Sequence, residues 1–139
     1  MAIAWLADAD AAKFILMRSE GQMSLRNCEV SFNTVAGASR DAGTIVNWGQ
    51  LTLNATTFQG NLLSRRYDGV ALASSVLNYG STRIDDVTIA ENIAGVVDEE
   101  AGAPQAPLVN LGNGKLELRA VREHDNLPAQ ALVANPIAP

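Results

Sequence analysis

The feature that most constrains this chain is a repeat with a period of about 30 residues. Each copy begins at a glycine, with apolar side chains two, four and nine residues later and an asparagine twelve residues later. The glycines are Gly21, Gly49, Gly80 and Gly114, and the asparagines are Asn33, Asn61, Asn92 and Asn126. Two positions depart from the pattern, because Thr82 stands at the second place of the third copy and Glu123 at the ninth place of the fourth. A period of this length is typical of stacked structural units.

A second signature, apolar–apolar–Asn–apolar–Gly, precedes the next strand of each copy. It occurs at Ile45–Gly49, Val76–Gly80 and Leu108–Gly112. Met17–Gly21 is a decayed form in which Ser19 replaces the asparagine, and an additional Asn113-Gly114 lengthens the turn of the last copy. Asparagine and glycine at one place in every copy indicate a recurring turn.

Within each copy of the repeat, apolar residues alternate with other residues, which indicates strands. Apolar residues at Leu51 and Leu53 are typical of a strand with one buried face. A unit of this size cannot bury its inner face alone, so equivalent strands of successive units must pair in parallel, about 4.8 Å apart. The twelfth-position asparagines favour a left-handed backbone conformation, and their amides can hydrogen-bond into a ladder. The sequence therefore predicts an all-β fold, a right-handed parallel β-helix (solenoid) of about four coils.

The repeat also predicts how the chain is organised. Each coil should hold strands around 51–53 and 57–58, a turn at Asn61, a variable loop and a third strand. The variable loops are 34–43, 62–73 and 93–107, and the prolines of the last loop argue against an interior strand there. The repeats occupy residues 17–126, with an N-terminal cap or partial coil at 1–16 and a C-terminal cap or linker at 127–139. Residues 1–17 suit either a capping amphipathic helix or a strand of a preceding coil, because open sheet edges need covering.

Charge and composition exclude several classes of partner. The net charge is −5 and basic residues form no stripe, so we expect no nucleic acid partner. No run approaches the roughly 20 apolar residues of a transmembrane helix, so we expect no membrane insertion. Cys28 is the sole cysteine, which rules out an internal disulfide. Asp8 and Asp10 stand where a signal peptide would be basic, so we expect a fragment or processed piece if the parent protein is secreted.

The segment Thr44–Asn61 resembles the repeats of bacterial β-helix surface proteins. These are the polymorphic outer-membrane protein-like repeats of autotransporter passengers, within the pectin lyase-like group. The likeness lies in Asn-x-Gly, the alternating apolar residues and the closing Phe-x-x-Asn, and it extends more weakly over about residues 15–126. The resemblance implies a secreted or cell-surface protein, often an adhesin or a protein in contact with polysaccharide. The chain departs from these proteins in having few coils, no signal peptide and no C-terminal β-barrel.

The strongest candidate for ligand binding is a pair of aromatic residues. Trp48 and Tyr79 stand between asparagine and glycine in successive copies, so stacking of the coils would bring them together. Such a pair on an outer corner suits a sugar-binding platform. The alternative is an aromatic ladder that only packs the corner beneath a neighbouring loop.

The outward positions of the predicted strands carry the candidate catalytic groups. The third-position row is Ser24, Thr52, Arg83 and Glu117, and the fifth-position row is Arg26, Asn54, Asp85 and Arg119. We interpret these rows as a solvated face with ion pairs, and we expect Asp85 and Asp86 not to point outward together. If the protein is an enzyme, the groove would be built from Arg83, Asp85, Glu117 and Arg119, since sugar-cleaving enzymes need carboxylates on one face.

The remaining candidates are weaker. His124 and Asp125 beside Glu123 lack a nucleophile, and we expect an exposed turn. The run 98–100 is acidic but lacks the alternating spacing of a calcium loop, so we expect no metal and no cofactor. Cys28 falls where other copies have Thr56, Val87 and Val121, which predicts a small core side chain.

These observations lead to one principal hypothesis with two alternatives. We expect a non-catalytic extracellular β-helix module, structural or adhesive, that contacts polysaccharide or a host or cell surface. Its neighbours would be further coils of a longer parent protein or copies in a homo-oligomer. The first alternative is a fragment of a polysaccharide lyase or glycoside hydrolase with a carboxylate and basic groove on the outer face. The second is a segment of a phage-tail or other multimeric spike.

Overall fold

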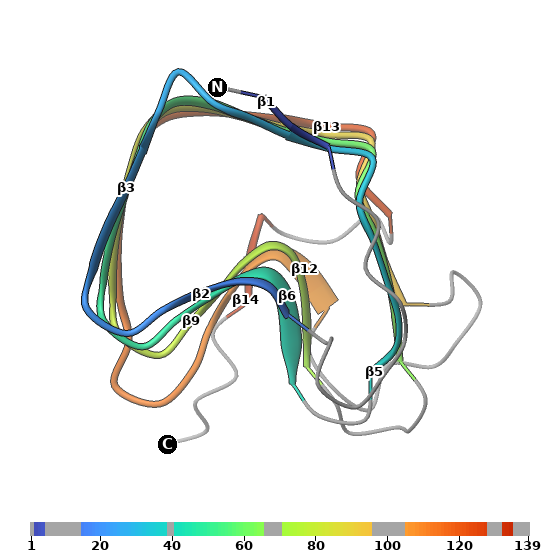
Figure 1. The fold of residues 1–139 in the computed structure, drawn as a ribbon, viewed down its shortest axis with the longest axis horizontal. Coiled ribbons are helices and arrows are strands. Elements are labelled where there is room, and N and C mark those ends of the chain that lie inside the picture. Colours follow the sequence, from blue (N-terminus) through green and yellow to red (C-terminus); the bar gives the residue numbers. More distant parts are fainter. Residues whose placement is uncertain are drawn as a thin grey trace.

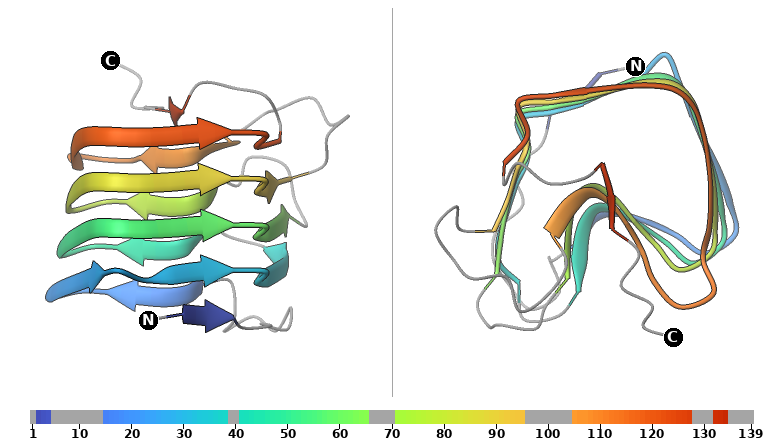
Figure 2. Two further views of the ribbon diagram at one scale, coloured as in Figure 1. Left: turned by 90° about the horizontal axis from the view of Figure 1, so that it is seen from above. Right: turned by 180° about the vertical axis from the view of Figure 1, so that it is seen from behind.

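The computed structural model describes residues 2–4, 15–38, 41–65, 71–95, 105–127 and 132–134. Within these ranges the protein is all-β, with parallel sheets and no helix, so none of the described elements is a helix that could cross a membrane. Figure 1 shows strands of successive repeats lying over one another around a common interior. The left view of Figure 2 shows the same strands as layers in chain order.

The strands form three sheets, and every strand pair within them is parallel. Sheet 1 contains β1 (Ala2–Ala4), β3 (Gln22–Arg26), β4 (Glu29–Ser31), β7 (Gln50–Gln59), β10 (Ser81–Ala90) and β13 (Lys115–His124). Sheet 2 contains β2 (Ile15–Ser19), β6 (Ala42–Asn47), β9 (Leu72–Asn78), β12 (Gln105–Asn110) and β14 (Val133–Ala134). Sheet 3 contains β5 (Thr34–Ala38), β8 (Leu62–Arg65) and β11 (Ile93–Ala94).

The register of the sheets confirms the alignment of the repeats. Leu51 of β7 lies opposite Met23 of β3 on one side and Thr82 of β10 on the other. Leu116 of β13 lies opposite Thr82, so the lengthened turn before the last copy does not disturb the pairing. Each repeat therefore contributes strands that pair with their equivalents one repeat away.

Apolar rows, with one residue from each repeat, form the main core. Two rows from sheet 1 and one from sheet 2 meet in it: Leu25, Leu53 and Ile84; Val30, Phe58 and Ile89; and Ile45, Val76 and Leu108. Burial of such a side chain contributes about 1.5–3 kcal/mol. Val46, Leu77 and Val109 alternate with the sheet 2 row and form a second cluster. Sheet 2 is thus buried on both faces, as is usual for parallel sheets.

Two asparagine ladders cross the interior, of which the first, at the twelfth position, is predicted from the sequence. In the first ladder the Nδ2 atoms of Asn33, Asn61 and Asn92 each donate to the Oδ1 of the asparagine one repeat later, at 2.9 Å. In the second, Asn47 Nδ2 donates to Asn78 Oδ1, and Asn78 Nδ2 to Asn110 Oδ1, both at 2.9 Å. A buried polar group without a partner costs about 1–3 kcal/mol, so the ladders fix which residues lie side by side.

The left-handed residues of the turns differ from the prediction. Positive φ angles occur at the residues just before the ladder asparagines, not at the asparagines: Phe32, Gly60, Glu91 and Asp125. A second left-handed set lies midway along sheet 1, within β7, β10 and β13 and between β3 and β4: Asn27, Ala55, Asp86 and Ala120. The strands bend there, and each of these residues drops out of the pairing register.

Several residues predicted to be loop are strands. Sheet 3 is built from the first residues of the segments 34–43, 62–73 and 93–107, directly after the ladder asparagines. Pro107, expected in a loop, lies within β12. The register of β12 against β9 shifts at Pro107, and the register of β6 against β9 shifts at the equivalent Thr44. The irregularity therefore belongs to β9, which has one residue more than its neighbours at this place. Ser75 Oγ donates to the Pro107 carbonyl, and Thr44 Oγ1 donates to the Ser74 carbonyl at 3.0 Å.

The two terminal segments add partial layers. Residues 2–4 form β1, which pairs with β4, so this part of the N-terminal segment is a strand. At the other end, β14 pairs with β12, and Leu127 forms a single bridge to Ile93. The rest of the predicted caps, and the acidic run 98–100, lie outside the described residues.

Candidate functional site

The turn between sheets 2 and 1 positions Trp48 and Tyr79. Asn47 Oδ1 accepts from the Gly49 N–H at 3.0 Å, and the Asn47 carbonyl accepts from the Tyr79 N–H at 2.7 Å. The glycines allow the turns to touch, because a Cβ on Gly80 would lie 2.2 Å from the Gly49 carbonyl oxygen. The aromatic residues of neighbouring repeats are therefore held in register by their own backbone.

The two rings stack, as the equivalence of their positions predicts. Their centroids are 5.3 Å apart and their planes differ by 5°. At this distance the rings cannot lie side by side in one plane, so they overlap as an offset stack and hide the faces that they share. Trp48 remains 41% exposed, whereas Tyr79 is partly buried against the second apolar cluster. A ligand would therefore meet mainly Trp48.

Asp41 anchors the buried side of the pair. The Tyr79 hydroxyl donates to Asp41 Oδ2 at 3.2 Å, and Asp41 Oδ1 accepts from the Ala71 N–H at 2.8 Å. Burial, together with the nearby charge and hydrogen bond of Asp41, raises the pKa of Tyr79 from 10.0 to about 12. Tyr79 thus stays a neutral donor over the physiological range. The repeat does not reveal Asp41, because Asp41 lies outside the repeating positions, in the variable segment 34–43.

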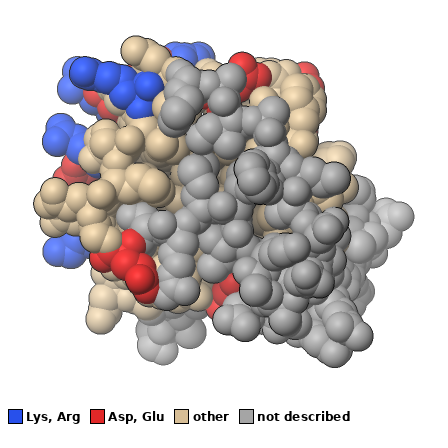
Figure 3. All heavy atoms as spheres, viewed as in Figure 1, with Lys and Arg blue, Asp and Glu red and all other residues tan. Residues whose placement is uncertain are grey.

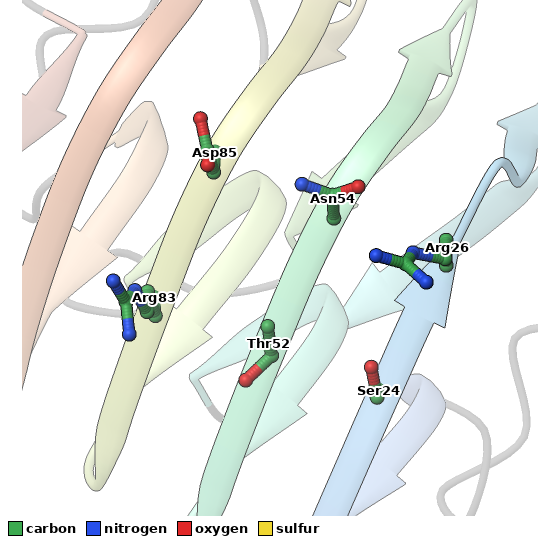
Figure 4. Close-up of a pocket in the computed structure, with 6 residues that line it drawn as sticks. All are labelled: Ser24, Arg26, Thr52, Asn54, Arg83 and Asp85. Atoms are coloured by element: carbon green, nitrogen blue, oxygen red, sulfur yellow. The ribbon is translucent and has the colours of Figure 1, made fainter.

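The outward rows of sheet 1 form a polar face. Figure 4 shows Ser24 and Arg26 of β3, Thr52 and Asn54 of β7, and Arg83 and Asp85 of β10 around one open depression. An adjoining depression is lined by Arg83, Asp85, Glu117 and Arg119, the four candidate catalytic residues, with Ile84 and Leu118 between them. Figure 3 shows that Lys and Arg side chains gather on the flank of the molecule where β3 lies.

The charges of this face pair with one another in solvent. Arg83 Nε lies 3.7 Å from Glu117 Oε2, with the two side chains 70% and 76% exposed. Exposed pairs of this kind contribute about 0–1 kcal/mol. Carboxylates and guanidinium groups that are this open to water can bind a polar ligand. They lack the water-excluding pocket in which electrostatic catalysis is strongest.

Asp86 also joins the charged surface, contrary to the expectation from regular alternation. Its left-handed backbone lets it face solvent, although the adjacent Asp85 lines the depression. Asp86 Oδ1 lies 2.7 Å from Arg122 Nη2, and Arg122 Nε donates to Thr88 Oγ1 at 3.1 Å. A regular strand would have turned Asp86 inward, and no signal in the sequence marked the left-handed residue.

The weaker candidates are also located. Cys28 is buried in the main core, as predicted. His124 is exposed, as predicted, but it is the last residue of β13, and Asp125 lies in the bend that follows, with His124 Nδ1 3.0 Å from Asp125 Oδ2. In the part of the chain that the structure describes, no three His, Cys, Asp or Glu side chains are grouped to hold a metal ion.

Comparisons with protein-family models, with curated proteins and with solved structures found no match to this chain.

Proposed function

We propose that this chain is a right-handed parallel β-helix that serves as a non-catalytic extracellular module, structural or adhesive, and contacts polysaccharide at Trp48 and Tyr79. It would act as a secreted or cell-surface protein of the kind that its repeats resemble. The observation that carries the proposal is the Trp48–Tyr79 stack, in which one ring remains 41% exposed on an outer corner.

The pairing of the strands supports the winding. Equivalent residues recur 28, 31 and 34 residues apart in the first asparagine ladder. In every sheet the paired strands come from successive repeats. Three parallel sheets around one core are what successive coils of such a helix would produce. Right-handed crossovers are by far the commoner hand for parallel strands.

The aromatic corner supports the glycan contact. An aromatic face carries partial negative charge and attracts the weakly positive C–H groups of a sugar ring. Tyr79 backs Trp48 at 5.3 Å, and Asp41 holds Tyr79 in turn, so the platform is rigid before any ligand arrives. A rigid platform loses little side-chain entropy on binding.

The first test is retention on a panel of plant and bacterial polysaccharides, with release of new chain ends measured in parallel. We expect retention without cleavage, and a loss of at least about fivefold in affinity in Trp48→Ala, by analogy with a base stacked on an aromatic side chain, which is worth about 1–3 kcal/mol. Tyr79→Phe keeps the ring and removes the hydroxyl, so it should retain binding. Equal binding by wild type and Trp48→Ala, with both proteins folded by circular dichroism, would exclude this site.

The second candidate is a polysaccharide lyase or glycoside hydrolase. The observation that favours it is the depression shared by Arg83, Asp85, Glu117 and Arg119 on adjacent strands. Cleavage would appear as new chain ends, and these should vanish in Asp85→Ala if Asp85 acts as acid or base. Cleavage that persists in Asp85→Ala would leave this candidate without its central residue.

A further inference from the structure

Strand β13 has the longest edge without a partner strand among the described residues of sheet 1. Among the described residues β13 pairs with β10 alone, so one of its edges has no partner strand there. An uncovered edge of ten residues is a template for pairing with another chain. The side chains of β13 therefore decide whether a second copy can add to the stack.

The composition of β13 is unlike that of the strands it resembles in register. Six of its ten residues are ionisable: Lys115, Glu117, Arg119, Arg122, Glu123 and His124. The equivalent interior strand β7 contains no ionisable residue. Charged side chains are the usual means by which proteins keep a sheet edge from pairing.

Among these residues, Glu123 opposes the addition of another strand most strongly. Its row contains Val30, Phe58 and Ile89, each fully buried in the core. A strand added on the open edge would cover Glu123 as β10 covers Phe58. Burial of an unpaired carboxylate costs several kcal/mol, and the apolar row offers it no counter-charge.

A second copy placed head-to-tail meets a further obstacle. Its outermost strand in sheet 1 is β1, whose Ile3 continues the row of Val30, so Ile3 would lie opposite Glu123. An apolar neighbour gives the carboxylate no counter-charge.

The other two sheets end differently at the same end of the molecule. Within the described residues, sheet 2 ends in β14, which has two residues, and sheet 3 ends in the single bridge from Leu127 to Ile93. Very short edge strands are another common way to prevent pairing.

We propose that this end of the stack, formed by β13, β14 and Leu127, is a closed end that rejects a second copy of this chain. A second copy can then add to the stack only at its opposite end, on the side of β2 and β3. This inference rests on strand register and charge, and is independent of the glycan site.

The test converts the β13 edge into an interior-type strand. One variant gives its six ionisable positions the residues of β7 in register: Lys115→Gln, Glu117→Thr, Arg119→Asn, Arg122→Thr, Glu123→Phe and His124→Gln. These changes remove three positive and two negative charges, so the net charge moves from −5 to −6 and does not approach neutrality. The control, Arg83→Thr with Asp85→Asn, gives the interior strand β10 the residues of β7 and leaves the edge intact.

The measurement is the mass in solution by light scattering over a concentration series. We expect the edge variant to reach at least about twice the mass of wild type, since head-to-tail contacts do not close. The control should match wild type. The single change Glu123→Val, which is less disruptive to folding, should raise the mass in the same direction. An unchanged or lower mass in both folded edge variants would overturn the proposal.

Discussion

The interior strand β7 and the end strand β13 occupy the same place in two repeats. Both have ten residues, and β10 pairs with each of them in the same register. The fourth-position leucine is fully buried at Leu53 and 41% exposed at Leu118. In the ninth position Phe58 is fully buried, whereas Glu123 is exposed.

This difference shows that the depth of a residue in the stack depends on its neighbours above and below as well as on its own strand. An interior side chain is enclosed by equivalents on both sides. The same side chain in the last layer is enclosed on one side only. A charged residue, Glu123, is therefore tolerated in β13 at a position where β7 must be apolar.

The largest expected effect tests this comparison at its centre. Leu53→Ala should lower the free energy of unfolding by about 2–5 kcal/mol, because it leaves a cavity in the core. Leu118→Ala, its match in the last layer, should cost less than about 1 kcal/mol, since water already reaches the side chain. Urea denaturation of both variants measures the contrast. Equal costs would mean that the last layer is as buried as the interior.

The second effect extends the comparison to the asparagine ladder. Asn92→Ala should destabilise the protein by on the order of 3 kcal/mol, because it removes four buried hydrogen bonds, to Asn61, Phe58 and Asn126, and leaves the Asn61 N–H without its acceptor. Asn126→Ala should cost less, since the last asparagine has no later rung to support. Thermal unfolding of the two variants gives the order, and a larger loss for Asn126→Ala would contradict it.

The third effect concerns the turns. In Gly80→Ala the new Cβ would meet backbone oxygen and carbon atoms of Gly49 and Trp48 at 2.2–2.7 Å, so we expect a cost of about 1–3 kcal/mol. The control is Gly21→Ala, in the first layer, where nothing lies within 4 Å. Near-ultraviolet circular dichroism should also change in Gly80→Ala alone, because Trp48 and Tyr79 flank the clash.

The smallest effect is a pH dependence confined to Tyr79. Its pKa is raised from 10.0 to about 12 in the folded protein, so folding favours the protonated phenol. The resulting contribution to stability is complete below pH 10 and is lost as the pH rises through about 12. Wild type should therefore lose thermal stability more steeply than Tyr79→Phe over this window. Asp41→Asn should shift the ultraviolet titration of the phenol to lower pH, and no shift would exclude Asp41 as a cause.

The rows that repeat could be predicted from the sequence, because each position faces the same surroundings in every layer. The all-β class, the parallel pairing, the first asparagine ladder and the Trp48–Tyr79 stack follow from that equivalence. The predicted winding as a β-helix stays a proposal that the pairing supports.

The parts that break the alternation could not be predicted. Sheet 3 has strands of two to five residues, too short to show a pattern. Asp86 points to solvent because one left-handed residue bends the strand, and Pro107 lies in β12 opposite an additional residue of β9. Asp41 supports the candidate site from a segment that follows no repeat. Such features depend on tertiary contacts that spacing does not reveal.

The asparagine ladders also have a direction. In both ladders the earlier residue donates and the later one accepts, without exception among the described rungs. Turning one amide over would set N–H against N–H on one side and oxygen against oxygen on the other. No rung can therefore invert alone, and each dipole polarises the next in the same sense. The side-chain amides of each ladder form one hydrogen-bonded chain with a single direction along the stack. The orientation of any one amide in a ladder therefore determines that of all the others in it.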